Sequence, residues 1–351
     1  ADDGPVVTSE ADIVRRAVLH AHAEQARGVP DRAVARGLSM WNGVIRDPVV
    51  LDRLRTRYGP EHVWSASQLQ TYTRCPFLFL IDRVLRLRPL DEAEESTSPL
   101  AFGSIAHDIL ERFYNACLDD MPASLTGAAA ERLDAAIADV IAEREKDGGW
   151  LGIPPLWAVT RTGLAERIRS YVAWELDYIH ETGEVPWRCE YVLEDGNGEA
   201  VVVTGTDVKG ETVRMRLTGR IDRIDRDARG RFFVLDYKSS TVPAAKCYAD
   251  GVLLQAPLYA EALRQTADID VSKARYRALK TPNKPKNGAM IGVGTAKYDA
   301  ALAYAFSVPA RVGEGLFEAV MAASSEWLWY DPDQGVIRTQ AVLKEGSRFD
   351  G

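Results

Sequence analysis

The sequence of 351 residues lacks the features of several large protein classes. No apolar run approaches the roughly 18 to 20 residues that a membrane-spanning helix needs. No basic stretch followed by an apolar segment and small residues opens the chain, so nothing suggests export. The sequence also lacks internal repeats, low-complexity tracts and a phosphate-binding loop of the Gly-x-x-x-x-Gly-Lys-Ser/Thr type. These absences argue against a membrane protein and a fibrous repeat, and they imply that any ATP-driven motor lies elsewhere.

Cysteine is also scarce in this chain. No two of the four cysteines have the spacing of a zinc ribbon or a redox motif, and they are widely separated: Cys75, Cys117, Cys189 and Cys247. So sparse a set in a long chain predicts a reduced protein in the cytoplasm.

An excess of basic charge is absent as well. The 43 basic and 51 acidic residues give a net charge of −8, which argues against broad, non-specific binding of nucleic acid. A local basic groove remains compatible with this balance. The composition, with 46% hydrophobic and 27% charged residues, is that of a globular protein. The length predicts about two domains, and because the first residue is Ala1, we expect a processed product or a piece of a longer chain.

Hydrophobic periodicity divides the chain into a helical part and a part that contains strands. The predicted helices are Ala11–Arg27, Val49–Tyr58, a helix capped by Ser65 or Ser67, Leu100–Leu118, Ala128–Glu145, Thr162–His180, Leu253–Arg264 and Val308–Ser325. The predicted strands are Glu190–Leu193, Ala200–Thr204, Thr212–Asp225, Arg231–Lys238 and Ala274–Leu279. The pattern therefore predicts a small mixed sheet in a larger helical frame.

The most informative segment is a predicted hairpin that carries two aspartates. Asp236 and Lys238 are two residues apart on a strand and therefore point to one face. If Asp222 pairs with Asp236, the centre of the hairpin is Arg229, in the middle of a turn-like segment that contains Gly230. Two carboxylates on adjacent strands would repel each other unless a divalent cation held them, and such oxygen ligands suit Mg²⁺ or Mn²⁺. The alternative is a pair of solvent-exposed acids beside a screening lysine.

Several motifs occur in one order along the chain. They are Ser65 to Phe77 (Ser-Ala-Ser-Gln-Leu-Gln-Thr-Tyr-Thr-Arg-Cys-Pro-Phe), Phe102-Gly-Ser-Ile-Ala-His107, Gly219-Arg-Ile-Asp222, Asp236-Tyr-Lys238 and Gln255-Ala-Pro-Leu-Tyr259. This set resembles the PD-(D/E)XK nuclease superfamily, specifically the RecB/AddB-type nuclease domain at the C-terminus of helicase–nuclease subunits. The resemblance covers about residues 64 to 280.

The resemblance implies an α/β (α+β) fold: a restriction-endonuclease-like core with a small mixed β-sheet flanked by helices, plus extra N-terminal helices. We expect residues 1–63 to be a helical segment that links from a larger chain. Residues 64–351 would form the nuclease domain, with a helical insertion at about 119–185.

The resemblance also implies roles for the residues of the site. Asp222 and Asp236 would ligate the metal, with the backbone carbonyl of Tyr237 and the side chain of His107 as further ligands. Lys238 would orient the attacking water and stabilise the pentavalent phosphorane. A lone histidine on an apolar helix is otherwise a satisfied core or surface residue. Glu190 begins the preceding strand, where the family often has an acid, and is a weaker metal candidate that could equally be a surface charge.

Gln255 and Tyr259 are one helical turn apart and face one side. In the family this pair lines the active site and contacts DNA, and Tyr259 offers a ring for base stacking. The alternative is a pair on a helix surface. Because Pro257 would break a helix interior, the helix should begin near Leu254.

A run of basic residues without an acid follows this helix. It comprises Lys273, Arg275, Arg277, Lys280, Lys284 and Lys286. Phosphate contacts of such residues would supply affinity without sequence information. The alternative is a solvated loop.

The chain departs from the AddB pattern in its cysteines. In that pattern a cysteine equivalent to Cys75 combines with three near the C-terminus to hold an iron–sulfur cluster, but no cysteine follows Cys247. We therefore expect no iron–sulfur cluster in this chain. The resemblance implies a metal-dependent DNA nuclease with Mg²⁺ or Mn²⁺, acting on single strands or duplex ends, in end processing or recombinational repair alongside a helicase and away from membranes. A non-catalytic DNA-binding or scaffold module of a helicase–nuclease complex is the alternative.

Overall fold

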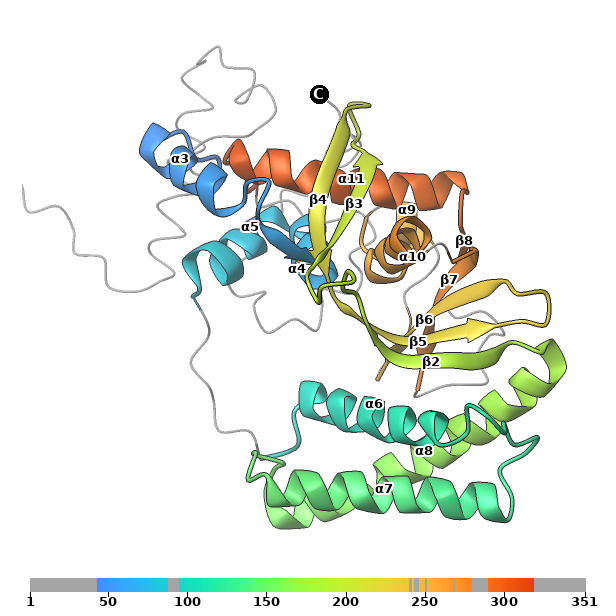
Figure 1. Cartoon of the computed structure of the whole chain (residues 1–351). Coiled ribbons are helices and arrows are strands. Elements are labelled where there is room, and N and C mark those ends of the chain that lie inside the picture. Colours follow the sequence, from blue (N-terminus) through green and yellow to red (C-terminus); the bar gives the residue numbers. More distant parts are fainter. Residues whose placement is uncertain are drawn as a thin grey trace, which may run out of the picture.

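The computed structural model describes residues 43–87, 95–239, 242, 246–249, 251–267, 269–279 and 290–318. A mixed sheet of five strands, in the order β2-β5-β6-β7-β8, lies at the centre of this part (Figure 1). Its strands are β2 Val185–Val192, β5 Arg220–Arg226, β6 Phe232–Lys238, β7 Val271–Ala278 and β8 Met290–Gly292. β6 and β7 are parallel and the other neighbours are antiparallel. The expected mixed sheet is therefore confirmed.

A second sheet of three strands stands beside the first. It has the order β1-β4-β3, with β1 Val63–Ser65, β3 Val201–Thr206 and β4 Thr212–Thr218. The prediction of a single strand from Thr212 to Asp225 is wrong, because the chain leaves one sheet at Gly219 and enters the other. A Cβ on Gly219 would lie only 2.6 Å from the ring of Tyr259, so the lack of a side chain at Gly219 allows that ring to approach the backbone closely.

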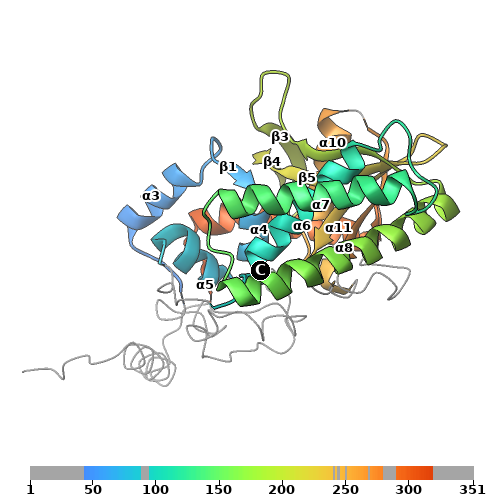
Figure 2. The same cartoon turned by 90° about the horizontal axis from the view of Figure 1, so that it is seen from below.

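Helices cover both faces of the five-stranded sheet. One side carries α6 Pro99–Asn115, α7 Ala128–Lys146 and α8 Pro154–Thr182, which Figure 1 shows as a layer of their own and Figure 2 shows from below. The other side carries α9 Lys246–Ala249, α10 Gln255–Thr266 and α11 Ala296–Gly313. Two shorter helices, α3 Pro48–Arg57 and α4 Ala66–Arg74, contact α11. They are followed by α5 Pro76–Phe79, which contacts α4, and by the π-helical η2 Leu80–Leu85. Helices on both faces of a mixed sheet are the fold class that the sequence predicted.

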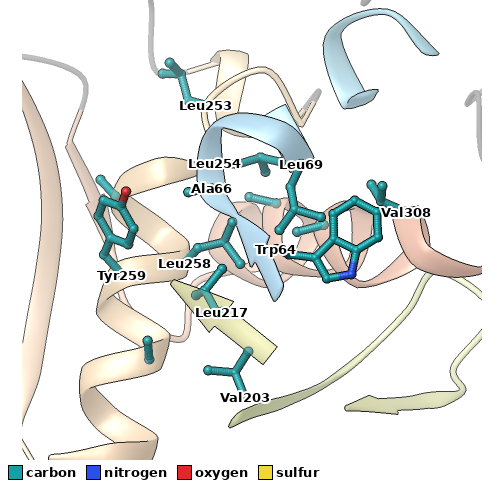
Figure 3. Packing of buried hydrophobic residues seen from close by; sticks show 14 of the residues in the cluster. Trp64, Ala66, Leu69, Val203, Leu217, Leu253, Leu254, Leu258, Tyr259 and Val308 are labelled. Atoms are coloured by element: carbon teal, nitrogen blue, oxygen red, sulfur yellow. The ribbon is translucent and has the colours of Figure 1, made fainter. Parts of the chain in front are cut away.

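Two hydrophobic clusters hold these layers together. β6 contributes residues to both of them, because its successive side chains point to opposite faces of the sheet. Val234 belongs to the cluster on the α10 side, whereas Leu235 and Tyr237 belong to the cluster on the α6–α8 side. Figure 3 shows the first cluster, in which Trp64 and Leu258 pack among buried residues of α4, α10 and α11. Because both faces are covered, every charged residue of β5 and β6 needs an ion-pair or hydrogen-bond partner, or has to lie at an edge of the sheet in contact with solvent.

Local signals place the helices that frame the site. Ser65 caps α4 through a capping box: its hydroxyl accepts from the backbone N–H of Gln68, and the Gln68 side chain accepts from the Ser65 N–H. α10 begins after Leu254 with Pro257 in its first turn, as predicted. The predicted helix Val308–Ser325 is wrong, because α11 starts at Ala296 and tolerates Pro309 near its C-terminal end. The predicted helix Ala11–Arg27 lies outside the described residues.

None of the helices described by the structure combines the length and apolar character needed to cross a lipid bilayer.

Candidate active site

The β5–β6 hairpin has the register that the sequence predicted. Arg223 pairs with Leu235 and Ile224 with Val234, and one further step along this register places Asp222 opposite Asp236. The turn is closed by the Asp227 side chain, which accepts backbone hydrogen bonds from the two arginines that flank Gly230 in the turn. The hairpin therefore brings both aspartates together one residue beyond its last paired residues, at the end of the hairpin that lies away from the turn.

A third strand extends this row of acids. Cys189 pairs with Arg223 and Tyr191 with Ile221, so Glu190 of β2 lies across from Asp222. Glu190 adopts a left-handed backbone conformation, with φ of 48°, which is uncommon for a residue other than glycine. Such conformations concentrate at functional sites. Glu190, the weaker candidate from the sequence, therefore belongs to the site geometrically.

His107 of α6 completes a group that could hold a metal ion. One ligand atom each from His107, Glu190 and Asp222 lies within 4.8 Å of the other two. Nδ1 of His107 is 3.5 Å from Oδ1 of Asp222, and the other oxygen of Asp222 accepts the backbone N–H of Tyr237 at 2.6 Å. The group combines one imidazole nitrogen with carboxylate oxygens, which is a donor set that Mn²⁺ and Mg²⁺ accept.

Asp236 and Lys238 lie beside this group and contact each other. Nζ of Lys238 is 2.6 Å from Oδ2 of Asp236 and donates to Oε1 of Gln255 at 2.8 Å. Asp236 is buried, with 4% of its surface exposed, whereas the Lys238 side chain is 30% exposed. The Asp236 carboxylate is turned toward the lysine rather than into the group of His107, Glu190 and Asp222.

Burial and crowding change the acidity of these groups. Burial raises the pKa of Asp236 to about 6 against the effect of Lys238, and the nearby charge of Asp222 adds to the rise. Burial and the charge of Asp222 raise the pKa of Glu190 to about 7. Burial opposes protonation of His107, yet the hydrogen bond and charge of Asp222 raise its pKa overall. A divalent cation bound among these crowded, buried acids would offset the repulsion between their carboxylates and favour their deprotonated forms.

Tyr259 supports the site rather than presenting a ring to solvent. It is 6% exposed, and its ring packs against Gly219 (Figure 3 shows the residue in the core). Burial raises the pKa of the Tyr259 hydroxyl, and the nearby charges of Asp236 and Asp222 add to the rise. The prediction that Tyr259 stacks on a base is therefore wrong for this arrangement, because α10 packs its ring inward. Gln255, in contrast, contacts the site through Lys238.

We expect Gly219→Ala to destabilise the protein by about 1–3 kcal/mol, because the new methyl group overlaps the Tyr259 ring. The free energy of unfolding in urea measures this change. Gly196→Ala is the matched control, since a Cβ at that position meets no atom within 4 Å. Equal stability of the two variants would show that the packing of Tyr259 on Gly219 is not tight.

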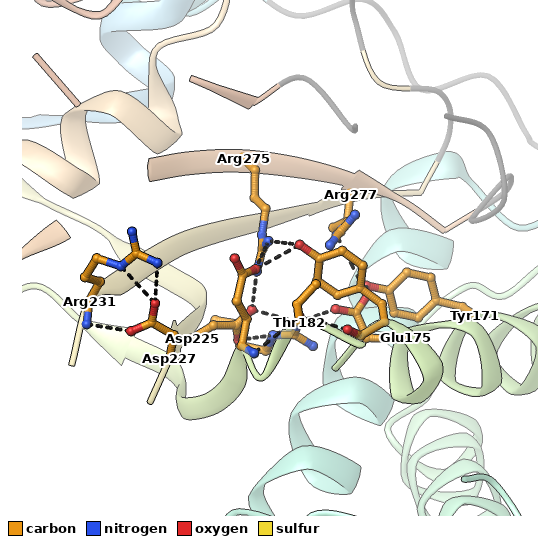
Figure 4. A network of polar contacts seen from close by, with 11 residues as sticks. Tyr171, Glu175, Thr182, Asp225, Asp227, Arg231, Arg275 and Arg277 are labelled. Atoms are coloured by element: carbon orange, nitrogen blue, oxygen red, sulfur yellow. Dashed lines mark hydrogen bonds and ion pairs between the residues drawn. The ribbon is translucent and has the colours of Figure 1, made fainter. Parts of the chain in front are cut away.

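The basic residues of β7 have a structural role that the sequence did not reveal. Arg275 and Arg277 are 2% and 4% exposed, because α8 covers their face of the sheet (Figure 4). Arg275 pairs with Asp225 at 2.6 Å and with Glu184 at 2.5 Å. Arg277 lies over the rings of the α8 residues Trp174 and Tyr178. The prediction that these two arginines bind DNA is wrong, since neither side chain reaches solvent.

Arg223 is the centre of the same buried network. It is fully buried and contacts Glu175 of α8 at 2.5 Å and Asp225 at 2.7 Å. It also donates to the hydroxyl of Tyr237 at 3.0 Å. Sequence reasoning missed this network, although charged residues on both faces of a central strand were a usable signal. Of the other predicted DNA-binding residues, Lys273 is partly exposed, and Lys280, Lys284 and Lys286 lie outside the described residues.

Comparisons with known proteins agree with the geometry. Residues 63–328 match the sequence profile of the PD-(D/E)XK nuclease superfamily. An ATP-dependent helicase/deoxyribonuclease subunit from Symbiobacterium thermophilum is 32% identical over 214 residues, which cover 58% of this chain and 18% of that protein. A protein of the same name from Ruminiclostridium cellulolyticum is 27% identical over 201 residues, covering 56% of this chain and 17% of the relative. The chain therefore spans less than a fifth of the length of these relatives.

Proposed function

The chain belongs to the PD-(D/E)XK nuclease superfamily, and we propose that it is a metal-dependent DNA nuclease that hydrolyses phosphodiester bonds. The observation that carries the proposal is the row of Glu190, Asp222 and Asp236 across three adjacent strands, with His107 and Lys238 beside it. A carboxylate row with a lysine at one end combines ligands for a cation with a group that can act on the substrate.

The acids of the row and His107 would share one task, which is to hold the metal. His107, Glu190, Asp222 and Asp236 would hold Mg²⁺ or Mn²⁺, with the Tyr237 carbonyl as a further ligand. The bound cation would supply an activated water and neutralise charge on the phosphoryl oxygens. The backbone N–H of Tyr237 holds one oxygen of Asp222, which leaves the other toward His107.

Lys238 would act on the substrate itself. Its ammonium group lies between Asp236 and Gln255 and is partly exposed, so it can donate to an attacking water or to a phosphate oxygen. Gln255 restricts the lysine from the α10 side. We further propose that the chain works in DNA end processing alongside a helicase, on the support of the names of its relatives.

Incubation of the chain with labelled DNA tests the proposal. The substrates are single-stranded and double-stranded DNA, each linear and circular. We expect cleavage of at least one linear substrate in Mg²⁺ or Mn²⁺ and of none in excess chelator, and the circular substrates distinguish endonuclease from exonuclease action. Full cleavage in chelator would contradict the proposed metal dependence. Binding without cleavage in either metal would instead favour a scaffold module.

The pKa values of the two raised acids lead to an expected pH dependence. Asp236 and Glu190 have ordinary values of 3.8 and 4.5 but values of about 6 and about 7 in the folded chain. The metal-free fold therefore gains stability from these protonated groups below about pH 4, and loses it as the pH rises through 6 and 7. A metal ion requires the deprotonated carboxylates.

We therefore expect Mg²⁺ to raise the melting temperature more at pH 8 than at pH 5.5, as measured by scanning calorimetry. Glu190→Gln should reduce this dependence, since the variant has no proton to release there. A shift by Mg²⁺ that is equal at both pH values would count against a metal site built on these acids.

A further inference from the structure

Arg220 of β5 lies at the rim of the candidate site with its charged group in solvent. Its side chain is 64% exposed, and Nη1 is 3.4 Å from Oε2 of Glu190, whose own side chain is 14% exposed. Arg220 is two residues from Asp222 and therefore points to the same face of the strand. The arginine thus flanks the acids on the β2 side, while Lys238 flanks them on the β6 side.

The backbone of Arg220 is held in place although its side chain is exposed. Arg220 pairs with Val192 of β2, and the carbonyl of the preceding Gly219 accepts from the backbone N–H of Leu193 at 2.9 Å. Tyr259 packs against Gly219, the residue before Arg220. A fixed backbone beneath an exposed guanidinium lowers the entropy lost when that group binds a ligand.

The contact between Arg220 and Glu190 is easily exchanged. An ion pair with so exposed a partner contributes little to stability. It uses one of the five N–H donors of the guanidinium, which can instead form a planar, two-point contact with a phosphate. If Glu190 ligates a cation, the positive charge of the cation offsets that of the carboxylate, the attraction of Glu190 for Arg220 weakens, and the guanidinium is free to bind another anion.

A substrate phosphate needs cationic partners at this position. The acids of the site repel an anion until the cation neutralises them. Arg275 and Arg277, the arginines predicted to contact phosphate, are buried in ion pairs or against aromatic rings on the opposite face of the sheet. Lys238 is already engaged with Asp236 and Gln255.

We propose that Arg220 is a phosphate-binding residue of the nuclease. When a divalent cation binds, the Arg220 side chain dissociates from Glu190 and binds a backbone phosphate of the DNA. The assignment rests on the proposed function and adds a substrate contact on the β2 side of the site. Arg220 binds the substrate and takes no part in activating water, so its removal weakens DNA binding more than it slows the chemical step.

Equilibrium binding of a fluorescent single-stranded oligonucleotide tests this proposal. The full chain carries Lys238→Met so that the DNA stays intact, and anisotropy is recorded in Mg²⁺ over a series of KCl concentrations. Adding Arg220→Met should raise Kd roughly tenfold. It should also make the slope of log Kd against log salt shallower by roughly 0.7, the value for one phosphate contact on a single strand. Arg220→Lys keeps the positive charge but lacks the planar guanidinium that can contact two phosphate oxygens. Its Kd should therefore lie between that of the parent and that of Arg220→Met.

Arg226→Met is the matched control, because Arg226 is an exposed arginine at the other end of the same strand. It should leave Kd within about twofold of the parent and the salt slope unchanged. Without Mg²⁺, Arg220→Met should have a smaller effect than with it, since Glu190 then still holds the arginine. The affinity for Mn²⁺, measured by calorimetry, should stay equal or become tighter in Arg220→Met.

An unchanged Kd and salt slope in Arg220→Met with Mg²⁺ would overturn the proposal. Equal losses in Arg220→Met and Arg226→Met would overturn it as well, since they indicate a general charge effect. Weaker Mn²⁺ binding in Arg220→Met would mean that the arginine only supports the acids. The two proposals can fail separately. If the wild-type chain cleaves no DNA, and Arg220→Met but not Arg226→Met weakens oligonucleotide binding, the proposed nuclease function fails and the phosphate contact stands.

Discussion

Replacing Lys238 by methionine is expected to slow DNA cleavage by at least about a hundredfold, the lower end of what a positioned proton-transfer or charge-stabilising group contributes. Lys238 is the cation held between Asp236 and Gln255 at distances of 2.6 and 2.8 Å. Methionine retains the length of the stem but has no group to donate to water or phosphate. The initial rate of cleavage at saturating DNA and Mg²⁺ measures the effect.

The control for this variant is Lys209→Met. Lys209 is a half-exposed lysine with only a 4.0 Å contact to Glu314, and it belongs to the turn between β3 and β4. This variant should cleave at the wild-type rate. Cleavage by Lys238→Met within about threefold of that rate would remove the lysine from the mechanism.

The second large effect concerns stability. Arg223→Met should lower the free energy of unfolding by about 3–5 kcal/mol, because it leaves the buried carboxylates of Glu175 and Asp225 short of a cation. All three side chains are completely buried. Urea unfolding, with the transition followed by circular dichroism, measures the loss.

A surface ion pair provides the comparison for this change. Arg169→Met removes a contact of 2.7 Å to Asp134, but both side chains are about half exposed. We expect a loss below about 1 kcal/mol there. Similar small losses for both variants would mean that the network around Arg223 relaxes without cost.

Part of the site could be predicted because it depends on local sequence, and part could not because it depends on contacts between residues far apart in the chain. The hairpin register depends on the turn around Asp227 and Gly230, which is local, so the opposition of Asp222 and Asp236 could be derived from spacing. Alternation along β7 places Arg275 and Arg277 on one face of the strand. It could not predict that α8 covers that face, because Arg275 and its partner Tyr178 of α8 are 97 residues apart in sequence.

Long-range packing decided the remaining differences. The prediction for Glu190 stayed weak because strand pairing between β2 and β5, not any local pattern, places it across from Asp222. Tyr259 was expected to face DNA because spacing on α10 puts it on the side of Gln255. Its ring fills the space that Gly219 leaves open, so the helix face predicted to line the groove is partly core.

The claim that the acid row binds a divalent cation can be examined directly by anomalous scattering from crystals of the chain grown with Mn²⁺. We expect one peak among His107, Glu190, Asp222 and Asp236, at roughly 2 Å from the carboxylate oxygens that ligate it. Binding would require the Asp236 carboxylate to turn from Lys238 toward the other ligands. Crystals of protein that cleaves DNA in the same Mn²⁺ buffer, but with no peak at this position, would contradict the assignment of the site.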